Sequence, residues 1–242
     1  MPDYRTVTAD YTRLMNKHFT PGRGGQTIQF ITRHHNGGVS NTDQTWNTWQ
    51  TREASAHYQI ETTGRVGQLV NDRDTAWANG DSTANARTIA IEHSNDGSPD
   101  YGMTDATVVA GGKWAGALCW FYKLGRPNYG TNIRDHRNFY GTACPYHLAN
   151  GGKYHARWMK AAQDQYDLMT NGTTPTTGAL MALTDAQQKQ LFDRVNYIFD
   201  QLCGPGDSFG GWSQTGSRTA VDTIAAIAAK VGVPNTRDTK AS

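Results

Sequence analysis

Short apolar runs typical of strands alternate with longer runs of helical periodicity along the first 170 residues, and this alternation limits the folds open to the chain. The strand-like runs cover residues 27–34, 56–61, 65–70 and 88–93. Helical spacing covers residues 105–123, behind a capping Thr104, then 153–169 and, more weakly, 44–54. Such a mixture predicts an α/β fold in which helices cover a sheet.

A stretch without apolar residues separates this region from the C-terminal part of the chain. Residues 171–178 consist of Asn, Gly, Thr and Pro, which favour turns and extended backbone. We therefore expect one domain over 1–170, a linker over 171–179 and a small separate unit over 180–242.

Two helices are predicted in the C-terminal unit. Residues 184–187 form a capping-box sequence, and the apolar residues that follow recur at helical spacing as far as Leu202. A second amphipathic helix is expected over 218–231. The result is a small helical hairpin, and each apolar stripe needs a partner: the other helix, the first domain or a second chain. Phe209 and Trp212, in the glycine-rich loop between the helices, either contact a ligand or cap the hairpin's own core.

Composition and charge exclude several classes of protein. With 37% hydrophobic residues, 18% charged residues and a net charge of +2, the chain is typical of a globular protein and lacks the basic patch of a nucleic-acid binder. No segment approaches the 18 or so apolar residues of a membrane span, and the polar N-terminus predicts neither a signal peptide nor an anchor. Three widely spaced cysteines, 119, 144 and 203, argue against a disulfide framework.

Histidine and cysteine side chains suggest a metal site. His34 and His35 stand at the end of a strand-like run, and period-two alternation points them to opposite sides. His136 and Cys144 are separated by a short glycine-containing loop, and a nitrogen and sulfur ligand set favours Zn²⁺. The alternative is that Cys144 is a small buried hydrophobic residue and His136 a surface residue. Cys119, inside an apolar helical stretch, is expected to be structural.

Glu92 lies in the apolar run Thr88-Ile89-Ala90-Ile91-Glu92-His93. Alternation places it on the face opposite Ile89 and Ile91, beside the small Ala90. Burying an unpaired carboxylate is costly. Glu92 is therefore either a functional group or one partner of a structural ion pair.

These motifs together resemble the type 2 N-acetylmuramoyl-L-alanine amidases, the zinc amidase family that includes bacteriophage endolysins and peptidoglycan recognition proteins. The motifs are HHNGG at 34–38, SAHY at 55–58 with a turn at Gly64, IAIE at 89–92 and a His and a Cys-Pro separated by seven residues at 136–145. They follow the family's order, and the resemblance covers about residues 25–165.

The resemblance implies a central mixed β-sheet flanked by helices, with an open groove over one zinc ion. It assigns His34, His136 and Cys144 as zinc ligands, with His35 as a neighbour. Some members carry a catalytic Tyr where this chain has Ala56, so proton transfer falls to Glu92. Thr142 matches a position that helps to hold the reacting oxygen.

One departure from the family pattern affects a substrate contact. Many members have a His after the Trp of an AWHAG-like loop, whereas this chain reads Ala76-Trp77-Ala78-Asn79. Trp46, Trp49, Tyr58 and Trp77 are expected to line the groove for sugar and peptide, because aromatic faces suit such ligands.

The function implied is hydrolysis of the amide between N-acetylmuramic acid and L-alanine in peptidoglycan. A chain without a signal peptide and with a C-terminal addition is most similar to a phage endolysin, which is made in the host cytoplasm and acts on the cell wall after release. Its expected partners are peptidoglycan and, through the C-terminal helices, a second copy of the chain. Neither nucleic acid nor a membrane is an expected partner.

Two other functions compete with hydrolysis. A non-catalytic peptidoglycan-binding module on the same fold would typically lack the cysteine ligand, whereas Cys144 is present. A blue-copper electron carrier also uses two His and one Cys, but it needs a weak axial Met that is absent from Cys144-Pro145-Tyr146-His147.

Overall fold

The computed structural model describes residues 2–171, 189–190, 193–195, 198, 202 and 219–233. The chain divides into two compact units, Met1–Pro175 and Thr176–Ser242. Each unit is described by itself.

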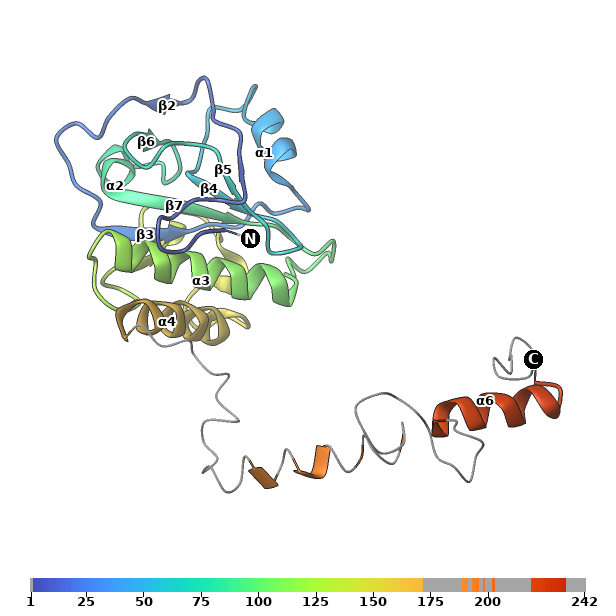
Figure 1. Ribbon diagram of the computed structural model, residues 1–242. Coiled ribbons are helices and arrows are strands. Elements are labelled where there is room, and N and C mark those ends of the chain that lie inside the picture. The colour runs from blue at the N-terminus through green and yellow to red at the C-terminus, as the bar shows by residue number, and fades with distance from the viewer. Residues whose placement is uncertain are drawn as a thin grey trace. The chain divides into compact units, whose positions relative to one another are not determined.

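A six-stranded mixed sheet forms the centre of the first unit (Figure 1). Its strand order is β1 (Tyr11–Thr12), β5 (Val66–Gln68), β4 (Tyr58–Ile60), β7 (Thr88–His93), β3 (Phe30–Arg33) and β8 (Ile133–Asp135). Only the β4–β5 pair is antiparallel among these strands. A separate antiparallel pair joins β2 (Phe19–Thr20) to β6 (Thr75–Ala76). The mixed sheet that the family resemblance implies is therefore confirmed.

Two long helices cover one face of the sheet, with α3 (Asp105–Phe121) next to the strands and α4 (His155–Asn171) outside it (Figure 1). Thr104 caps α3 as expected, because its hydroxyl accepts a hydrogen bond from the Thr107 amide at 3.0 Å. Gly112 and Gly116 let the helices approach closely, since a Cβ at either position would collide with the backbone of α4. Helix α3 is therefore buried on most of its surface.

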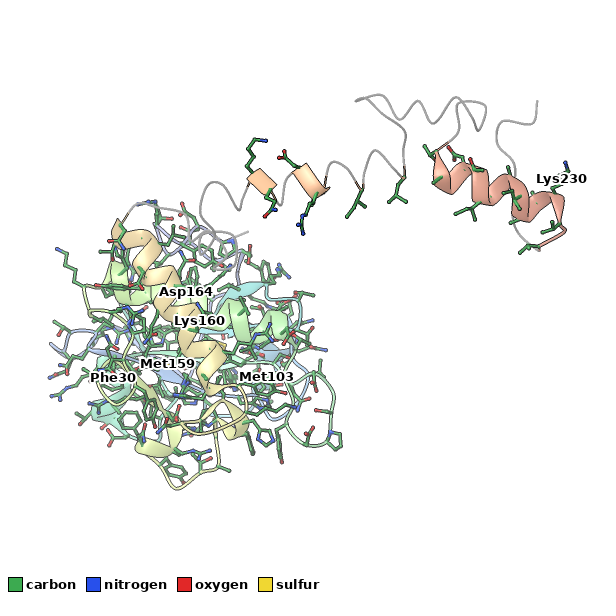
Figure 2. The ribbon with its side chains drawn as sticks, turned by 90° about the horizontal axis from the view of Figure 1, so that it is seen from below. Phe30, Met103, Met159, Lys160, Asp164 and Lys230 are labelled. Atoms are coloured by element: carbon green, nitrogen blue, oxygen red, sulfur yellow. The ribbon has the colours of Figure 1, made fainter. Side chains whose placement is uncertain are left out.

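Helix α4 is amphipathic, with one side toward α3 and the other toward solvent. Met159 is buried, whereas its neighbour Lys160 is exposed and forms an ion pair with Asp164 one turn later, at 2.6 Å (Figure 2). This pairing follows from the i, i+4 spacing of opposite charges on an exposed helical face.

The opposite side of the first unit carries the short helices α1 (Thr42–Thr48) and α2 (Ser82–Arg87), together with β2 and β6 (Figure 1). Alternation along β7 divides its side chains between two apolar clusters. Ile89 and Ile91 join the larger cluster with the α3 and α4 residues, whereas Ala90 belongs to a smaller one that contains Trp49. Glu92 shares the Ala90 face, as period two predicts.

Most expected elements of the first unit are confirmed. Several are shorter than expected, whereas β7 has the expected bounds and α4 is shifted by two residues. The expected helix over 44–54 is α1, which ends at Thr48 because the chain turns at Trp49. Two short 3₁₀ turns, η1 (His136–Asn138) and η2 (Tyr146–Leu148), follow β8. The strand β8 itself was not expected from the sequence.

The second unit contains α6 (Ala220–Lys230), which corresponds to the expected helix over 218–231 (Figure 2). Thr219 and Asp222 cap it reciprocally. Residues 189–190, 193–195, 198 and 202 of the other expected helix are helical, whereas its capping box and the loop with Phe209 and Trp212 lie outside the described residues. In the described part of the chain, no helix is long and apolar enough to cross a bilayer.

Candidate active site

A groove lies at the edge of the sheet where β7, β3 and β8 end. His34 follows β3, His136 follows β8, and Glu92 is the penultimate residue of β7. Because β3 pairs in parallel with both neighbours, the carboxyl ends of the three strands meet at one edge, where α/β proteins commonly bind ligands. The groove has a volume of about 380 Å³, within the range of small-molecule sites.

Three side chains able to bind a metal ion converge in this groove. One ligand atom each from His34, His136 and Cys144 lies within 4.8 Å of the other two. Cys144 Sγ is 4.0 Å from His34 Nδ1, and the two imidazole centroids are 4.5 Å apart. Two nitrogens and one sulfur suit Zn²⁺, and three protein ligands leave one position open, as catalytic zinc sites require. The donor set therefore fits zinc.

Asn79 contacts both histidines of this set. Its Oδ1 lies 3.1 Å from His34 Nε2, and its backbone makes a hydrogen bond with His136. Since an amide oxygen only accepts, the His34 proton lies on Nε2, and the Nδ1 lone pair faces Cys144. Sequence reasoning missed this role and treated Asn79 only as a departure from the AWHAG-like pattern. The signal available in the sequence was the polar Asn79, which directly follows the apolar run Ala76-Trp77-Ala78.

The protonation states of the three residues suit metal binding. Burial lowers the pKa of His34 well below its ordinary value, and the neighbouring His136 lowers it further. Burial also lowers the pKa of His136, so both rings are neutral at pH 7. Burial, with a contribution from Glu92, raises the pKa of Cys144, so its thiol keeps its proton until a cation displaces it.

Backbone contacts hold the cysteine loop against the strand ends. The His35 amide donates to Cys144 Sγ at 3.3 Å, and the Arg137 amide donates to the Cys144 carbonyl at 3.2 Å. The Arg137 guanidinium also donates to the Ala143 carbonyl at 2.7 Å. The loop is therefore closed on itself, with the thiol facing His34.

The side chain of His35 lies outside the cluster. Its Nδ1 accepts a hydrogen bond from the Gly37 amide at 2.9 Å, and its ring meets the edges of Tyr101 and Tyr146. The structure thus places His34, and not His35, with His136 and Cys144.

Glu92 reaches the groove from β7. Its Oε2 is enclosed and has no hydrogen-bond partner, and the residue forms no ion pair with any described residue. Burial raises the pKa of Glu92 to about 7, against a smaller lowering by the charge of Arg52. A carboxyl group with a pKa near neutrality exchanges protons readily at the pH of the cell, which suits a general acid or base.

Thr142 also lines the groove, close to the cysteine. Its hydroxyl oxygen accepts a hydrogen bond from the Cys144 amide at 3.1 Å. This bond orients the hydroxyl and leaves its hydrogen free to donate to a negatively charged oxygen in the groove.

Of the four aromatic residues expected to line the groove, Trp49 and Trp77 do so, and Trp77 is 38% exposed. The expectation for Tyr58 is wrong, because its side chain is 0% exposed and packs against Trp114 in the core. Trp46 is also misplaced: it packs under Arg13 and donates to the Leu14 carbonyl, away from the groove lining.

Comparisons with solved structures show the same fold. The structure of PlyL aligns with a TM-score of 0.53 at 18% identity, covering 64% of this chain and 97% of that one. AmiA, a Staphylococcus aureus hydrolase solved with its ligand, aligns with a TM-score of 0.54 at 16% identity, covering 68% of this chain and 86% of that one. A mutant endolysin from Bacillus subtilis aligns with a TM-score of 0.50 at 15% identity, covering 64% of this chain and 99% of that one.

The C-terminal part has a relative of its own. Residues 183–233 match the sequence model of the Rv3766 C-terminal domain. The uncharacterized protein Rv3766 of Mycobacterium tuberculosis is 47% identical over 62 residues, which are 23% of this chain. The match spans only 22% of the length of that curated relative.

The first unit matches a family by sequence. The sequence model of the N-acetylmuramoyl-L-alanine amidases matches residues 24–147, slightly more than half of the chain. This range contains every residue of the groove described above, from His34 to Tyr146. The chain belongs to the N-acetylmuramoyl-L-alanine amidase family.

Proposed function

We propose that this chain is a zinc-dependent peptidoglycan hydrolase that cleaves the amide between N-acetylmuramic acid and the L-alanine of the stem peptide. The observation that carries the proposal is the convergence of His34, His136 and Cys144 beside the unpartnered carboxylate of Glu92 in one groove. Membership of the amidase family supports the bond assignment.

In this proposal His34, His136 and Cys144 hold one zinc ion. When bound there, zinc supplies Lewis acidity for the amide carbonyl and for the attacking water. Asn79 keeps the Nδ1 lone pair of His34 directed into the site, and the Cys144 loop excludes solvent from the thiol side.

Glu92 and Thr142 carry out the remaining chemistry. Oε2 of Glu92 takes a proton from the attacking water and returns it to the L-alanine nitrogen as the C–N bond breaks. The Thr142 hydroxyl donates to the oxyanion that forms on the carbonyl oxygen, since its own oxygen is already held by the Cys144 amide. Trp77 offers a face to sugar or peptide on the groove wall.

Digestion of purified peptidoglycan, followed by mass analysis of the products, tests this function. The zinc-loaded chain should release intact stem peptides and unsubstituted glycan strands. New reducing sugars, or stem peptides cut internally, would instead identify a different hydrolase. Glu92→Gln protein, which keeps the shape of the site, serves as the matched inactive control.

We also propose a catalytic domain over 1–170, a linker over 171–179 and a targeting or self-association unit over 180–242. The division of the chain near Pro175 and the separate family match of residues 183–233 support it. Ile224 and Ile227 of α6, together with Val231 directly after the helix, are exposed, which leaves an apolar stripe for a partner. Truncation at Gly178 should leave an active amidase with weaker binding to intact walls or a smaller oligomer mass in light scattering. An insoluble or metal-free product would show that the division is mistaken.

The biological role we propose is that of a phage endolysin, made in the host cytoplasm and active on the wall after release. The fold similarity to an endolysin from Bacillus subtilis supports this role. Expression inside a bacterial host, with and without a protein that permeabilises the membrane, would test it. Lysis that depends on permeabilisation is the expected result, and lysis without it would indicate another export route.

A further inference from the structure

Arg52 lies on the groove wall, on the turn that follows α1. It borders the main groove together with Glu92 and His136, and also a second hollow of about 340 Å³ that continues past His136 to Tyr140. Among the described residues that border the main groove, Arg52 is the one with a permanent positive charge. A substrate that fills the groove therefore lies next to the Arg52 guanidinium.

The backbone beneath Arg52 is firmly held. Its amide donates to the Thr48 carbonyl at 3.2 Å, and its carbonyl accepts from the Ala54 amide at 2.8 Å. Trp49, three residues earlier, is buried in the smaller apolar cluster and anchors the turn. The position of the Arg52 Cα is thus fixed relative to the groove, whereas its side chain is exposed.

The Arg52 guanidinium has no partner among the described residues. Other arginines of the first unit form ion pairs, as Arg13 does with Asp43 and Arg126 with Asp167, but no hydrogen bond or ion pair of the Arg52 side chain is present in the described part of the chain. Glu92, the one acidic residue described on the main groove, forms no ion pair with Arg52. The cation is therefore available to an anion that enters from outside.

Building on the proposed amidase function, we propose that Arg52 is a specificity-determining residue that binds the free carboxylate of the second stem-peptide residue. A guanidinium pairs with a carboxylate through two parallel hydrogen bonds, which a carboxamide cannot reproduce. Arg52, Glu92 and His136 border the same groove, and Arg52 and His136 also border the second hollow, so Arg52 lies on the wall of the site in which the reaction would take place. The carboxylate nearest to the scissile amide, beyond L-alanine, belongs to the second residue.

A matched pair of soluble substrates tests this assignment. N-acetylmuramoyl-L-alanyl-D-glutamate and its D-isoglutamine analogue differ only in one carboxylate, which the analogue carries as an amide. The zinc-loaded full chain should cleave the acid with a kcat/KM about 2- to 5-fold higher than the amide, the size expected of an exposed ion pair. Arg52→Gln should abolish this preference, and Arg52→Lys should restore part of it. Arg73→Gln removes an exposed arginine outside the groove and should keep the wild-type ratio.

The outcomes separate the inference from the function on which it rests. If the wild-type chain cleaves both substrates equally well, the role of Arg52 is overturned and the amidase stands. If Arg52→Gln slows both substrates by the same factor, Arg52 acts through Glu92 and not on the substrate, which also overturns the proposal. If the chain cleaves neither substrate nor whole peptidoglycan, the amidase function fails and the inference falls with it.

Discussion

Arg33 and Asp135 form a fully buried ion pair that joins β3 to β8 directly before the two histidines of the candidate site. The two residues are partners in the strand register, and Asp135 Oδ1 lies 2.8 Å from Arg33 Nε and 2.7 Å from Arg33 Nη2. Both side chains are 0% exposed. Asp135 Oδ2 also accepts a hydrogen bond from the Asn150 amide at 3.0 Å. The pair thus fixes the two strand ends from which His34 and His136 extend.

Removing one partner of this pair should destabilise the fold. Asp135→Asn leaves the Arg33 charge buried without a counter-ion, which costs about 3 to 5 kcal/mol of unfolding free energy. Urea unfolding of the metal-free protein measures this loss. Asp167→Asn breaks the exposed pair with Arg126 and should have a much smaller effect. Equal losses in the two variants would contradict a special role for the buried pair.

Cys144 is expected to be required for zinc. Cys144→Ser should lose both bound zinc and amidase activity, because the thiolate is one of three ligands. Cys119→Ser, in the core of α3, should keep zinc and activity. Metal analysis of the purified variants gives the answer. An intense blue protein would point to copper and reject the assignment.

The histidine pair gives a second test of the ligand set. His34→Ala should lose zinc, whereas His35→Ala should retain it, since only the His34 ring lies in the cluster. Zinc content measured at equal protein concentration distinguishes them. The reverse result would show that the ligand is the neighbouring residue.

Glu92→Gln should lower turnover by about 10² to 10⁴ with zinc retained. The amide keeps the size of the side chain but cannot transfer a proton from the enclosed Oε2 position. Rates on soluble muropeptides, together with zinc content, measure the two effects. Near-normal turnover would assign proton transfer to another group, and loss of zinc would make Glu92 a structural support.

The raised pKa of Glu92 predicts how stability depends on pH in the metal-free protein. Burial raises this pKa from 4.5 to about 7. Below pH 4.5 the carboxyl is protonated in both the folded and the unfolded state, so it has no effect. Between pH 4.5 and 7 the unfolded state ionises first, so Glu92 increasingly destabilises the fold. Glu92→Gln should therefore become more stable than the wild type over this interval and keep a constant advantage above it. Thermal midpoints with a chelator present test this, and a difference that does not vary with pH would refute it.

Asn79→Ala should weaken zinc binding about 10- to 100-fold, because the hydrogen bond to His34 Nε2 that selects the metal-binding tautomer is lost. Competition with a chromogenic chelator measures the affinity. Asn47→Ala, an exposed residue of α1, is the control and should bind zinc as the wild type does. An unchanged affinity in Asn79→Ala would mean that packing alone orients His34.

Elements with a strong local pattern could be predicted from the sequence. The run 88–93 is a strand with the expected bounds, because its alternation separates Ile89 and Ile91 from Ala90 and Glu92. Helix α3 begins behind the expected cap at Thr104, because a threonine side chain satisfies amides that the first turn leaves free.

Elements that depend on distant partners could not be predicted in this way. The strand β8 has only three residues, Ile133–Asp135, too few for a periodic signal, and it exists because it pairs with β3. The sequence also did not determine which aromatic side chains are exposed. Tyr58 is enclosed by the core, whereas Trp77 lies on the groove. Burial depends on what packs against a side chain, and neighbouring sequence does not contain that information.

For the candidate site too, part of the information lies in the sequence and part only in the tertiary structure. The types and order of the histidines, Glu92 and Cys144 already indicated zinc chemistry and an amidase, because ligand softness and proton transfer are properties of the side chains themselves. The tertiary structure decided which of them meet. His34 and Cys144 are 110 positions apart in the chain and come together only because β3 and β8 pair in parallel and the loop after β8 folds back over their ends. The contact between Asn79 and His34 arises in the same way, since the two residues are 45 positions apart in the chain.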